Sequence, residues 1–369
     1  MAGRRFTRWG LCALLLTLAS PTLAANLIIE DLALTITPPG QASLRLEAVV
    51  VRPDDGQRHP LAIINHGAPR DPADRPGMTA RTLIPQAQEF ARRGWTSVIA
   101  LRRGYGTSEG SYAESSGPCN SPDYVAAGRA SASDLRQIIA AASALPSVDP
   151  SKVISVGISA GGLATVALTA DPPANLVAAI SFAGGRGSTK PDSVCSQDLL
   201  VRAFATFGQT SRVPMLWVYA ENDHFFNPAL AAQFHAAFTK AGGIAYLEQT
   251  EAFGTDGHQL FSLKGIPVWT GYVDSFLRQQ GLRPRATPLA LDEPRVAPPP
   301  RLAAKNRDSF EEYLQAPPHK AFVMDESGAF GWRSGRRSVD DAVEGARERC
   351  GKFAKSKCRP VMIENQLQH

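Results

Sequence analysis

Short apolar runs alternate with longer helical patterns over residues 28–281, and this alternation constrains the fold of the 369-residue chain more than any other feature. The apolar runs are too continuous to be half exposed, which is typical of strands buried on both faces of a parallel sheet. Helical segments between successive strands place helices on both faces of such a sheet. We therefore predict an α/β fold with a mostly parallel sheet of about eight strands.

The elements of this fold can be assigned to residue ranges. Residues 26–37 and 43–52 alternate apolar and polar side chains, as an opening antiparallel hairpin would. Residues 184–211 are rich in Gly and Ser and interrupt the strand-helix rhythm, so we predict a lid-like insertion there, over the carboxyl ends of the strands. The other expected strands are 61–64, 96–100, 153–157, 176–182, 215–220 and 244–248, and the expected helices are 79–93, 124–144, 161–169, 228–241 and 268–280.

The first 25 residues have the pattern of a cleaved signal peptide, with three arginines, an apolar run and small residues at the end. The run is shorter than the roughly 20 residues of a spanning helix, so an uncleaved anchor is the weaker alternative. The segment contains no acid, and its removal lowers the formal net charge from +5 to +2. Such a small charge argues against a nucleic-acid partner. We expect an exported protein, periplasmic or extracellular.

The rest of the chain divides at a change in composition. We expect residues 26–283 to form the large α/β domain, and the prolines that cluster over residues 284–304 predict a linker. Residues 305–369 are expected to form a small α+β domain, with strands at 321–324, 330–332 and 360–364 and a helix that Ser338 caps. Its basic residues Arg333, Arg336 and Arg337 beside Trp332 suit a weak contact with an anionic envelope polymer, although a solvated charged face explains them better.

Four cysteines remain once Cys12 leaves with the signal peptide: Cys119, Cys195, Cys350 and Cys358. An even number in an exported protein indicates disulfides, and four cysteines allow three pairings. Local grouping favours Cys119 with Cys195 and Cys350 with Cys358, and the second bond would staple the small domain. The spacings form no CxxC pair and no HExxH is present, so we expect no metal.

The sequence Gly157-Ile158-Ser159-Ala160-Gly161 follows a buried strand and precedes a helix. This context is typical of the GxSxG elbow, where flanking glycines allow a tight turn that lifts the serine Oγ above the sheet. A bare GxSxG match is weak, but its position at a strand end makes Ser159 the candidate nucleophile.

A serine nucleophile needs a base, and the base needs a group that orients it. Asp223 follows the strand 215–220, and His258 lies in a glycine-rich loop after the last strand. Glu221 is a weaker rival to Asp223, and His224 and Asp256 also lie nearby. Asp256 is interpreted as shaping the turn before His258.

An acyl-transfer site also needs backbone N–H groups for the oxyanion. Asn65-His66-Gly67-Ala68-Pro69 follows the strand 61–64, and proline at position 69 has no N–H. The amides of Ala68 and Ala160 are therefore the expected donors. His66 is interpreted as a structural residue of this loop, next to Gly67.

These residues together resemble the α/β-hydrolase superfamily, and within it the secreted dienelactone-hydrolase-like and prolyl-oligopeptidase-like serine hydrolases. The resemblance rests on His66–Pro69, Arg102-Arg-Gly-Tyr-Gly-Thr-Ser108, the elbow, Asp223 and His258, and it covers residues 28–281. It implies the α/β-hydrolase fold and a Ser-His-Asp triad that cleaves esters, lactones, amides or peptides without a cofactor. Many dienelactone hydrolases use cysteine where this chain has serine.

The predicted function is therefore hydrolysis of an ester, lactone or related acyl bond in a small-molecule substrate through an acyl-enzyme. The alternatives are a peptidase-type serine hydrolase and an envelope-binding protein with a non-catalytic hydrolase scaffold. Arg103 and Tyr105 are candidate substrate-binding residues, although an arginine that bridges to neighbouring acids and a packing tyrosine are the favoured interpretations. Phe225 is a candidate for lining an acyl pocket.

Overall fold

The computed structural model describes residues 26–291 and 294–368, so the predicted signal peptide lies outside the described residues. An eight-stranded sheet forms its centre, in the order β1-β2-β4-β3-β5-β6-β9-β10. The first two strands form an antiparallel hairpin, β2 pairs antiparallel with β4, and all other neighbours are parallel. This arrangement confirms the predicted fold class. The strands are β1 (Leu27–Ile36), β2 (Leu44–Pro53), β3 (His59–Asn65), β4 (Thr96–Ala100), β5 (Val148–Ile158), β6 (Leu176–Phe182), β9 (Met215–Ala220) and β10 (Ala245–Thr250).

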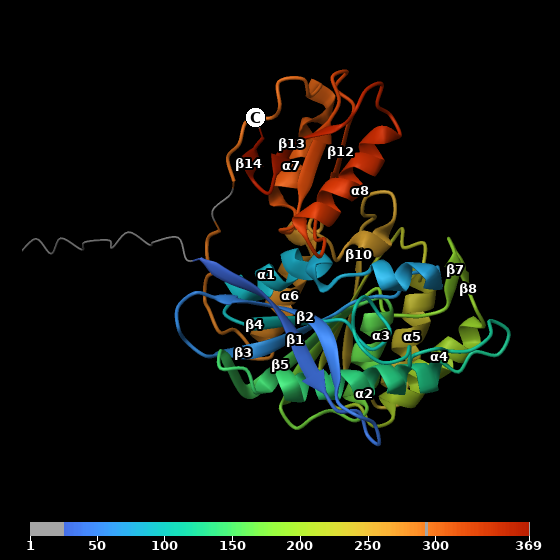
Figure 1. Cartoon of the computed structure of the whole chain (residues 1–369). Helices are drawn as coiled ribbons and strands as arrows, with labels where there is room; N and C mark the ends of the chain where they lie inside the picture. Colours follow the sequence, from blue (N-terminus) through green and yellow to red (C-terminus); the bar gives the residue numbers. More distant parts are fainter. Residues whose placement is uncertain (1–25, 292–293, 369) are drawn as a thin grey trace, which may run out of the picture.

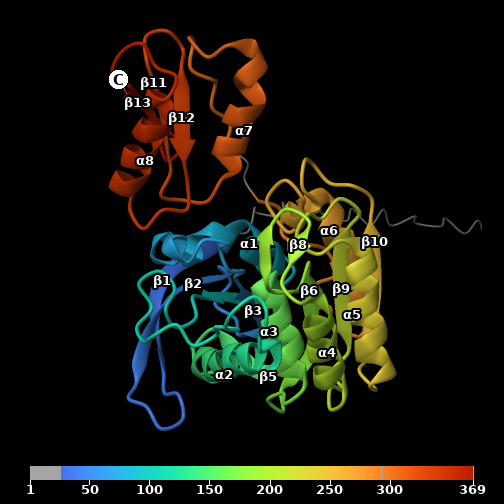
Figure 2. The ribbon, with the colours of Figure 1, turned by 90° about the vertical axis from the view of Figure 1, so that its right-hand side faces the viewer.

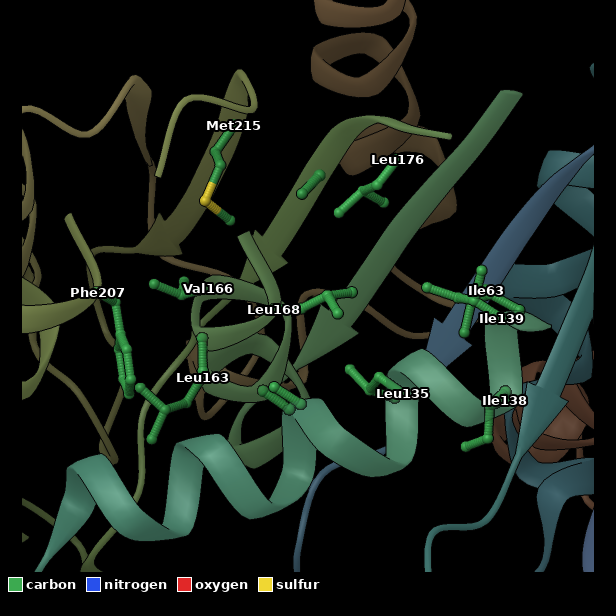
Figure 3. Close-up of a cluster of buried hydrophobic side chains, with 14 of the residues drawn as sticks. Ile63, Leu135, Ile138, Ile139, Leu163, Val166, Leu168, Leu176, Phe207 and Met215 are labelled. Atoms are coloured by element: carbon green, nitrogen blue, oxygen red, sulfur yellow. The ribbon is translucent and has the colours of Figure 1, made fainter. Parts of the chain in front are cut away.

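Helices cover both faces of the sheet (Figure 1). One apolar core lies between the sheet and α2, α3, α4 and α5, and Figure 3 shows part of it, with Leu135 of α2 pointing toward the strands. The other core joins the opposite face to α1 and α6 through side chains such as Phe90 and Trp269. These helices are α1 (Ile84–Arg92), α2 (Tyr124–Ser143), α3 (Ala160–Thr169), α4 (Gln197–Gly208), α5 (Pro228–Lys240) and α6 (Ile266–Gln279).

Two segments differ from the sequence prediction. The helix expected from residue 79 begins as a 3₁₀ turn, Ala80–Leu83, and continues as α1, whose first turn contains Pro85. In the segment predicted as an insertion, β7 (Ser188–Lys190) and β8 (Ser193–Val194) form a small hairpin, but most of the remainder is α4. That helix buries Leu200, Phe204 and Phe207 in the main core, so it belongs to the layered fold.

The C-terminal unit has its own four-stranded antiparallel sheet, in the order β12-β11-β13-β14. Helix α8 begins as predicted, with the Ser338 hydroxyl accepting the Asp341 N–H at 3.1 Å. The sequence analysis missed α7 and β14. The elements are α7 (Arg307–Gln315), β11 (Ala321–Met324), β12 (Phe330–Arg333), α8 (Val339–Gly351), β13 (Arg359–Ile363) and β14 (Gln366–Leu367), and the remaining 3₁₀ turns of the chain are Pro72–Gly77, Gly257–Gln259 and Ala304–Asn306.

This unit, orange to red in the figures, lies at one end of the molecule near α1 (Figures 1 and 2). Arg337 reaches the large domain and donates to the carbonyls of Met78 and Pro76, at 2.6 and 2.9 Å. The same guanidinium lies 3.4 Å from the carboxylate of Glu47. The C-terminal unit therefore holds the loop that precedes α1.

Two disulfides are present, between Cys119 and Cys195 and between Cys350 and Cys358. The first joins residues 76 positions apart and the second only 8. Across residues 26–291 and 294–368, no helix has the length and apolar character needed to cross a membrane.

Candidate active site

Ser159 stands on a sharp turn between β5 and α3. Its φ of 56° and ψ of −122° lie outside the regions that L-residues usually adopt, as in the elbow that presents a nucleophile. A Cβ on Gly157 would collide with the carbonyl of Gly161, and one on Gly161 would collide with the carbonyls of Asn65 and His66. The two glycines of the motif are therefore required by close backbone approach.

Asp223 and His258 come together at the carboxyl ends of β9 and β10. The Nδ1 of His258 lies 3.1 Å from one carboxylate oxygen of Asp223 and 3.2 Å from the other. The Asp223 side chain is fully buried, and its Oδ1 also accepts the N–H groups of Phe225 and Phe226. The ring of Phe225 stacks on the imidazole at 3.8 Å between centroids.

Asp256 shapes the turn that carries His258. Its Oδ1 accepts the N–H groups of both His258 and His224, at 3.0 and 3.1 Å. The imidazole of His224 instead pairs with Asp192 on the β7–β8 hairpin. Glu221, the rival to Asp223, is exposed. The structure therefore brings Asp223, and neither rival acid, to the imidazole of His258.

The loop after β3 runs beside Ser159. A Cβ on Gly67 would lie 3.2 Å from the Cβ of Ser159. The amides of Ala68 and Ala160 donate to no group of the described residues, and Ala160 is the first residue of α3, where helix N–H groups lack internal partners. Both amides are therefore free to bind an oxyanion.

His66 is buried and holds this loop in place. Its Nε2 accepts the N–H of Arg102 at 3.0 Å, while Nδ1 donates to the carbonyl of Gly67 at 2.7 Å. Burial, together with the nearby charge of Arg102, lowers the pKa of His66 to about 3. An imidazole that both donates and accepts in this way fixes the loop after β3 to Arg102.

A pocket of ≈ 300 Å³ opens at Ser159. Ala68 and Ala160 line it together with Phe225 and the disulfide residues Cys119 and Cys195. The Cys195 carbonyl accepts the hydroxyl of Tyr124 at 2.6 Å, which fixes the disulfide against α2. The pocket therefore contains Ser159 and both candidate oxyanion donors.

Two candidate substrate-binding residues lie elsewhere. Arg103 is buried and pairs with Asp134 at 2.8 Å, so its guanidinium is used inside the protein. Tyr105 is fully buried and packs edge-on against His66 at 4.5 Å. Neither residue lines the pocket, and both match the alternative interpretation of their loop. Phe225 does line it.

Charged residues that were not predicted from the sequence surround the pocket: Arg70, Arg75, Arg186 and, behind them, Glu114. Two of them did carry a positional signal. Arg70 directly follows the Ala68-Pro69 loop, and Arg186 lies in Gly184-Gly-Arg-Gly187, shortly after β6. Both positions are near the carboxyl ends of parallel strands, where ligands of α/β sheets bind. Within residues 26–291 and 294–368, no group of three or more His, Cys, Asp or Glu side chains could hold a metal ion.

Residues 42–208 match the model of the family described as X-Pro dipeptidyl-peptidase (S15 family). The matched segment contains Ser159 and the loop after β3, and it ends before Asp223 and His258. No curated protein matches the chain.

Several solved structures are similar to this chain over about two thirds of its length. The esterase Pf2001 of Pyrococcus furiosus aligns with a TM-score of 0.49 and 12% identity, over 68% of this chain and 93% of its own. Esterase Est2 of Thermogutta terrifontis aligns with a TM-score of 0.45 and 20% identity, over 69% and 94%. The acylaminoacyl peptidase of Pyrococcus horikoshii aligns with a TM-score of 0.47 and 16% identity, over 72% and 43%.

Proposed function

We propose that this chain, an α/β hydrolase by its fold, is a serine hydrolase that cleaves an ester, lactone or related acyl bond. The observation that carries the proposal is the position of Ser159. It lies on a strained elbow in a pocket with two free backbone amides, while the Asp223–His258 pair stands at the carboxyl ends of β9 and β10 in the same sheet. A scaffold without catalysis has no need of this combination.

In the first half of the reaction, His258 takes the proton of Ser159 as Oγ attacks the acyl carbon. The amides of Ala68 and Ala160 stabilise the negative charge that forms on the carbonyl oxygen. Asp223 holds Nδ1 of His258 as the donor and stabilises the imidazolium. His258 then gives the proton to the leaving group, and the acyl-enzyme remains.

In the second half, His258 removes a proton from water, which attacks the acyl carbon. The carboxylic acid leaves, and the proton returns to Ser159. The net reaction consumes one water and needs no cofactor.

Within the described residues Oγ of Ser159 makes no hydrogen bond. Ser159 and His258 must therefore approach each other when substrate binds, as is common for catalytic hydrogen bonds in free enzymes.

The pocket volume supports a short acyl group, and the proposal is tested with p-nitrophenyl esters from acetate to octanoate. The protein should be produced without residues 1–25 under oxidising conditions, with Ser159→Ala as the matched variant. We expect turnover of short esters that falls at least ~10⁴-fold in the variant, and fluorophosphonate labelling that the variant lacks. A loss below tenfold would reject Ser159 as the nucleophile.

The same experiment separates the alternatives. Labelling of Ser159 without turnover of any ester would favour a peptidase-type substrate, which the S15 family match makes the second candidate. Absence of both labelling and turnover would favour a binding protein. We also propose that the chain acts outside the cytoplasm, and the two disulfides support this location.

A further inference from the structure

The pocket at Ser159 is lined by charges of one sign. Arg70, Arg75 and Arg186 line it, and none of its lining residues is Asp, Glu or Lys. A pocket built for the amino terminus of a peptide would be expected to offer a carboxylate. Three guanidinium groups instead favour an anion.

Arg186 is built into the protein beneath this pocket. It is only 9% exposed, its Nη2 lies 2.6 Å from Glu114, and its Nη1 donates to the hydroxyl of Tyr112 at 2.9 Å. Its Nε is buried and has no hydrogen-bond partner among the described residues. Such a rigid, partly unsatisfied guanidinium is costly to maintain in a site that binds only neutral groups.

Glu114 cannot neutralise Arg186 alone, because it also pairs with the buried Arg102 at 3.1 Å. Its remaining partner, the hydroxyl of Ser131, is neutral. His66, which packs beside Arg102, is also neutral at ordinary pH. Two buried guanidinium groups thus share one carboxylate, and one positive charge is left over.

The other two arginines are held by aromatic rings. Arg70 lies 3.5 Å from the ring centroid of Phe225, and Arg75 lies 3.8 Å from that of Tyr112. Arg70 also donates to the Ser188 hydroxyl, and neither arginine pairs with a carboxylate in residues 26–291 and 294–368. Arg70 therefore lies over the Phe225 ring, which stacks on His258. Arg75 lies over the Tyr112 ring, whose hydroxyl accepts a hydrogen bond from Arg186.

We propose that this pocket selects a small acyl substrate that bears a carboxylate, which Arg70, Arg75 and Arg186 bind while Ser159 attacks the ester or lactone carbonyl. Guanidinium groups pair with carboxylates through charge-assisted hydrogen bonds, often two at once. The ≈ 300 Å³ volume accommodates a short acyl chain with a terminal carboxylate. The proposal rests on the serine hydrolase function and names its substrate class.

The test compares two esters of equal length, the mono-4-nitrophenyl ester of glutarate and 4-nitrophenyl pentanoate, which differ in a terminal carboxylate or methyl group. Ser159→Ala supplies the rate of spontaneous hydrolysis for subtraction. We expect kcat/KM for the glutarate ester to exceed that for pentanoate by about tenfold or more at low salt, the scale of one charged hydrogen bond.

Arg70→Gln and Arg75→Gln should each lower this ratio about threefold to tenfold, as expected for a partly solvated charge. Arg202→Gln is the matched control, because Arg202 is an exposed arginine of α4 that does not line the pocket. These two rim variants avoid the buried Arg186, whose replacement could prevent folding. High salt should lower the ratio in the native protein as well.

The outcomes separate this proposal from the general function. Turnover of pentanoate with no preference for the glutarate ester would overturn the anionic substrate class and leave the serine hydrolase intact. If neither ester is cleaved and Ser159 is not labelled, the serine hydrolase function is rejected. The anion pocket is then tested separately, by the binding of free glutarate. A rise in Tm with glutarate that Arg70→Gln abolishes would still support the anion pocket, and no rise would overturn it.

Discussion

Asp223 holds His258 through both of its carboxylate oxygens, at 3.1 and 3.2 Å from Nδ1, and the same carboxylate accepts two backbone N–H groups of its own loop. The carboxylate cannot turn away without losing those bonds. The imidazole is therefore oriented before substrate arrives, with Nε2 as the nitrogen available for proton transfer.

Replacing this acid should remove most of the activity. Asp223→Asn is expected to lower kcat about 10⁴-fold, because an amide can hold the wrong imidazole tautomer. The exposed Glu221 provides the control, and Glu221→Gln should retain native kcat. The measurement is kcat on a short p-nitrophenyl ester, with circular dichroism to verify folding. If Asp223→Asn lowered kcat by less than tenfold, the orienting role would belong to another group.

The ring of Phe225 should also position His258. Phe225→Ala removes the stacked face and is expected to lower kcat about threefold to tenfold, the scale of an aromatic contact. Phe225→Tyr keeps the ring and should restore kcat. If the alanine variant changed only KM, the ring would be part of the acyl pocket and not a support for the imidazole.

Glu114 should contribute more to stability than any surface ion pair. Glu114→Gln leaves Arg102 and Arg186 buried without a counter-charge, and we expect a loss of about 3–5 kcal/mol in the free energy of unfolding. Glu109→Gln is the control, because Glu109 pairs with Arg45 at the surface. Urea unfolding should show almost no change in the control. Equal effects of the two substitutions would contradict the buried cluster.

Acid should destabilise the protein in two stages. The pKa of His66 is about 3, below its ordinary 6.5, so between these values the unfolded chain binds a proton that the folded chain does not. Stability therefore falls as pH drops below about 6.5, by up to about 1.4 kcal/mol per pH unit for this group.

Glu114 adds the second stage. Burial acts to raise the pKa of Glu114, but its attraction to Arg102 and Arg186 prevails and lowers that pKa to about 2 from an ordinary 4.5. The stability that Glu114 contributes is therefore lost as pH falls below 4.5.

Urea unfolding of the native protein and of His66→Asn from pH 7 to pH 4 measures the first stage, which comes from His66. The variant should show a smaller slope, and equal slopes would exclude His66 as its source.

The two disulfides should differ in their effect on stability. Closing a loop of 76 residues restricts the unfolded chain more than closing one of 8. The expected losses are about 4.5 kcal/mol for Cys119→Ser with Cys195→Ser and about 2.5 kcal/mol for Cys350→Ser with Cys358→Ser. Only the first pair lines the pocket, so only that double variant should change KM. The reverse order of stabilities would contradict the loop-length argument.

The parts of the site that depend on local backbone geometry could be predicted from the sequence. The elbow requires glycine at positions 157 and 161 because neighbouring carbonyls leave no room for a Cβ, and this requirement is visible in the sequence. The Ser338 cap is visible for the same reason, since a cap depends on a hydroxyl three residues from its N–H partner.

The charges around the pocket could not be predicted in this way. Arg186 pairs with Glu114 across 72 positions, and nothing near either residue indicates the other. Arg103 is a candidate substrate-binding residue by its position in the sequence, but the neighbouring α2 supplies Asp134, which pairs with it. Which arginine of a chain meets an internal acid and which meets solvent is decided by tertiary packing.

The Cys119–Cys195 bond has a further consequence for how the protein matures. Its two sulfurs belong to one wall of the pocket, yet the chain must reach residue 195 before that wall can close. The hydrogen bonds that hold Asp223 and His258 involve no cysteine, whereas the lining of the pocket includes both cysteines. In a newly made chain in a reducing environment, Ser159 and His258 would thus be in place before this wall is cross-linked, and oxidation would be the step that completes the pocket.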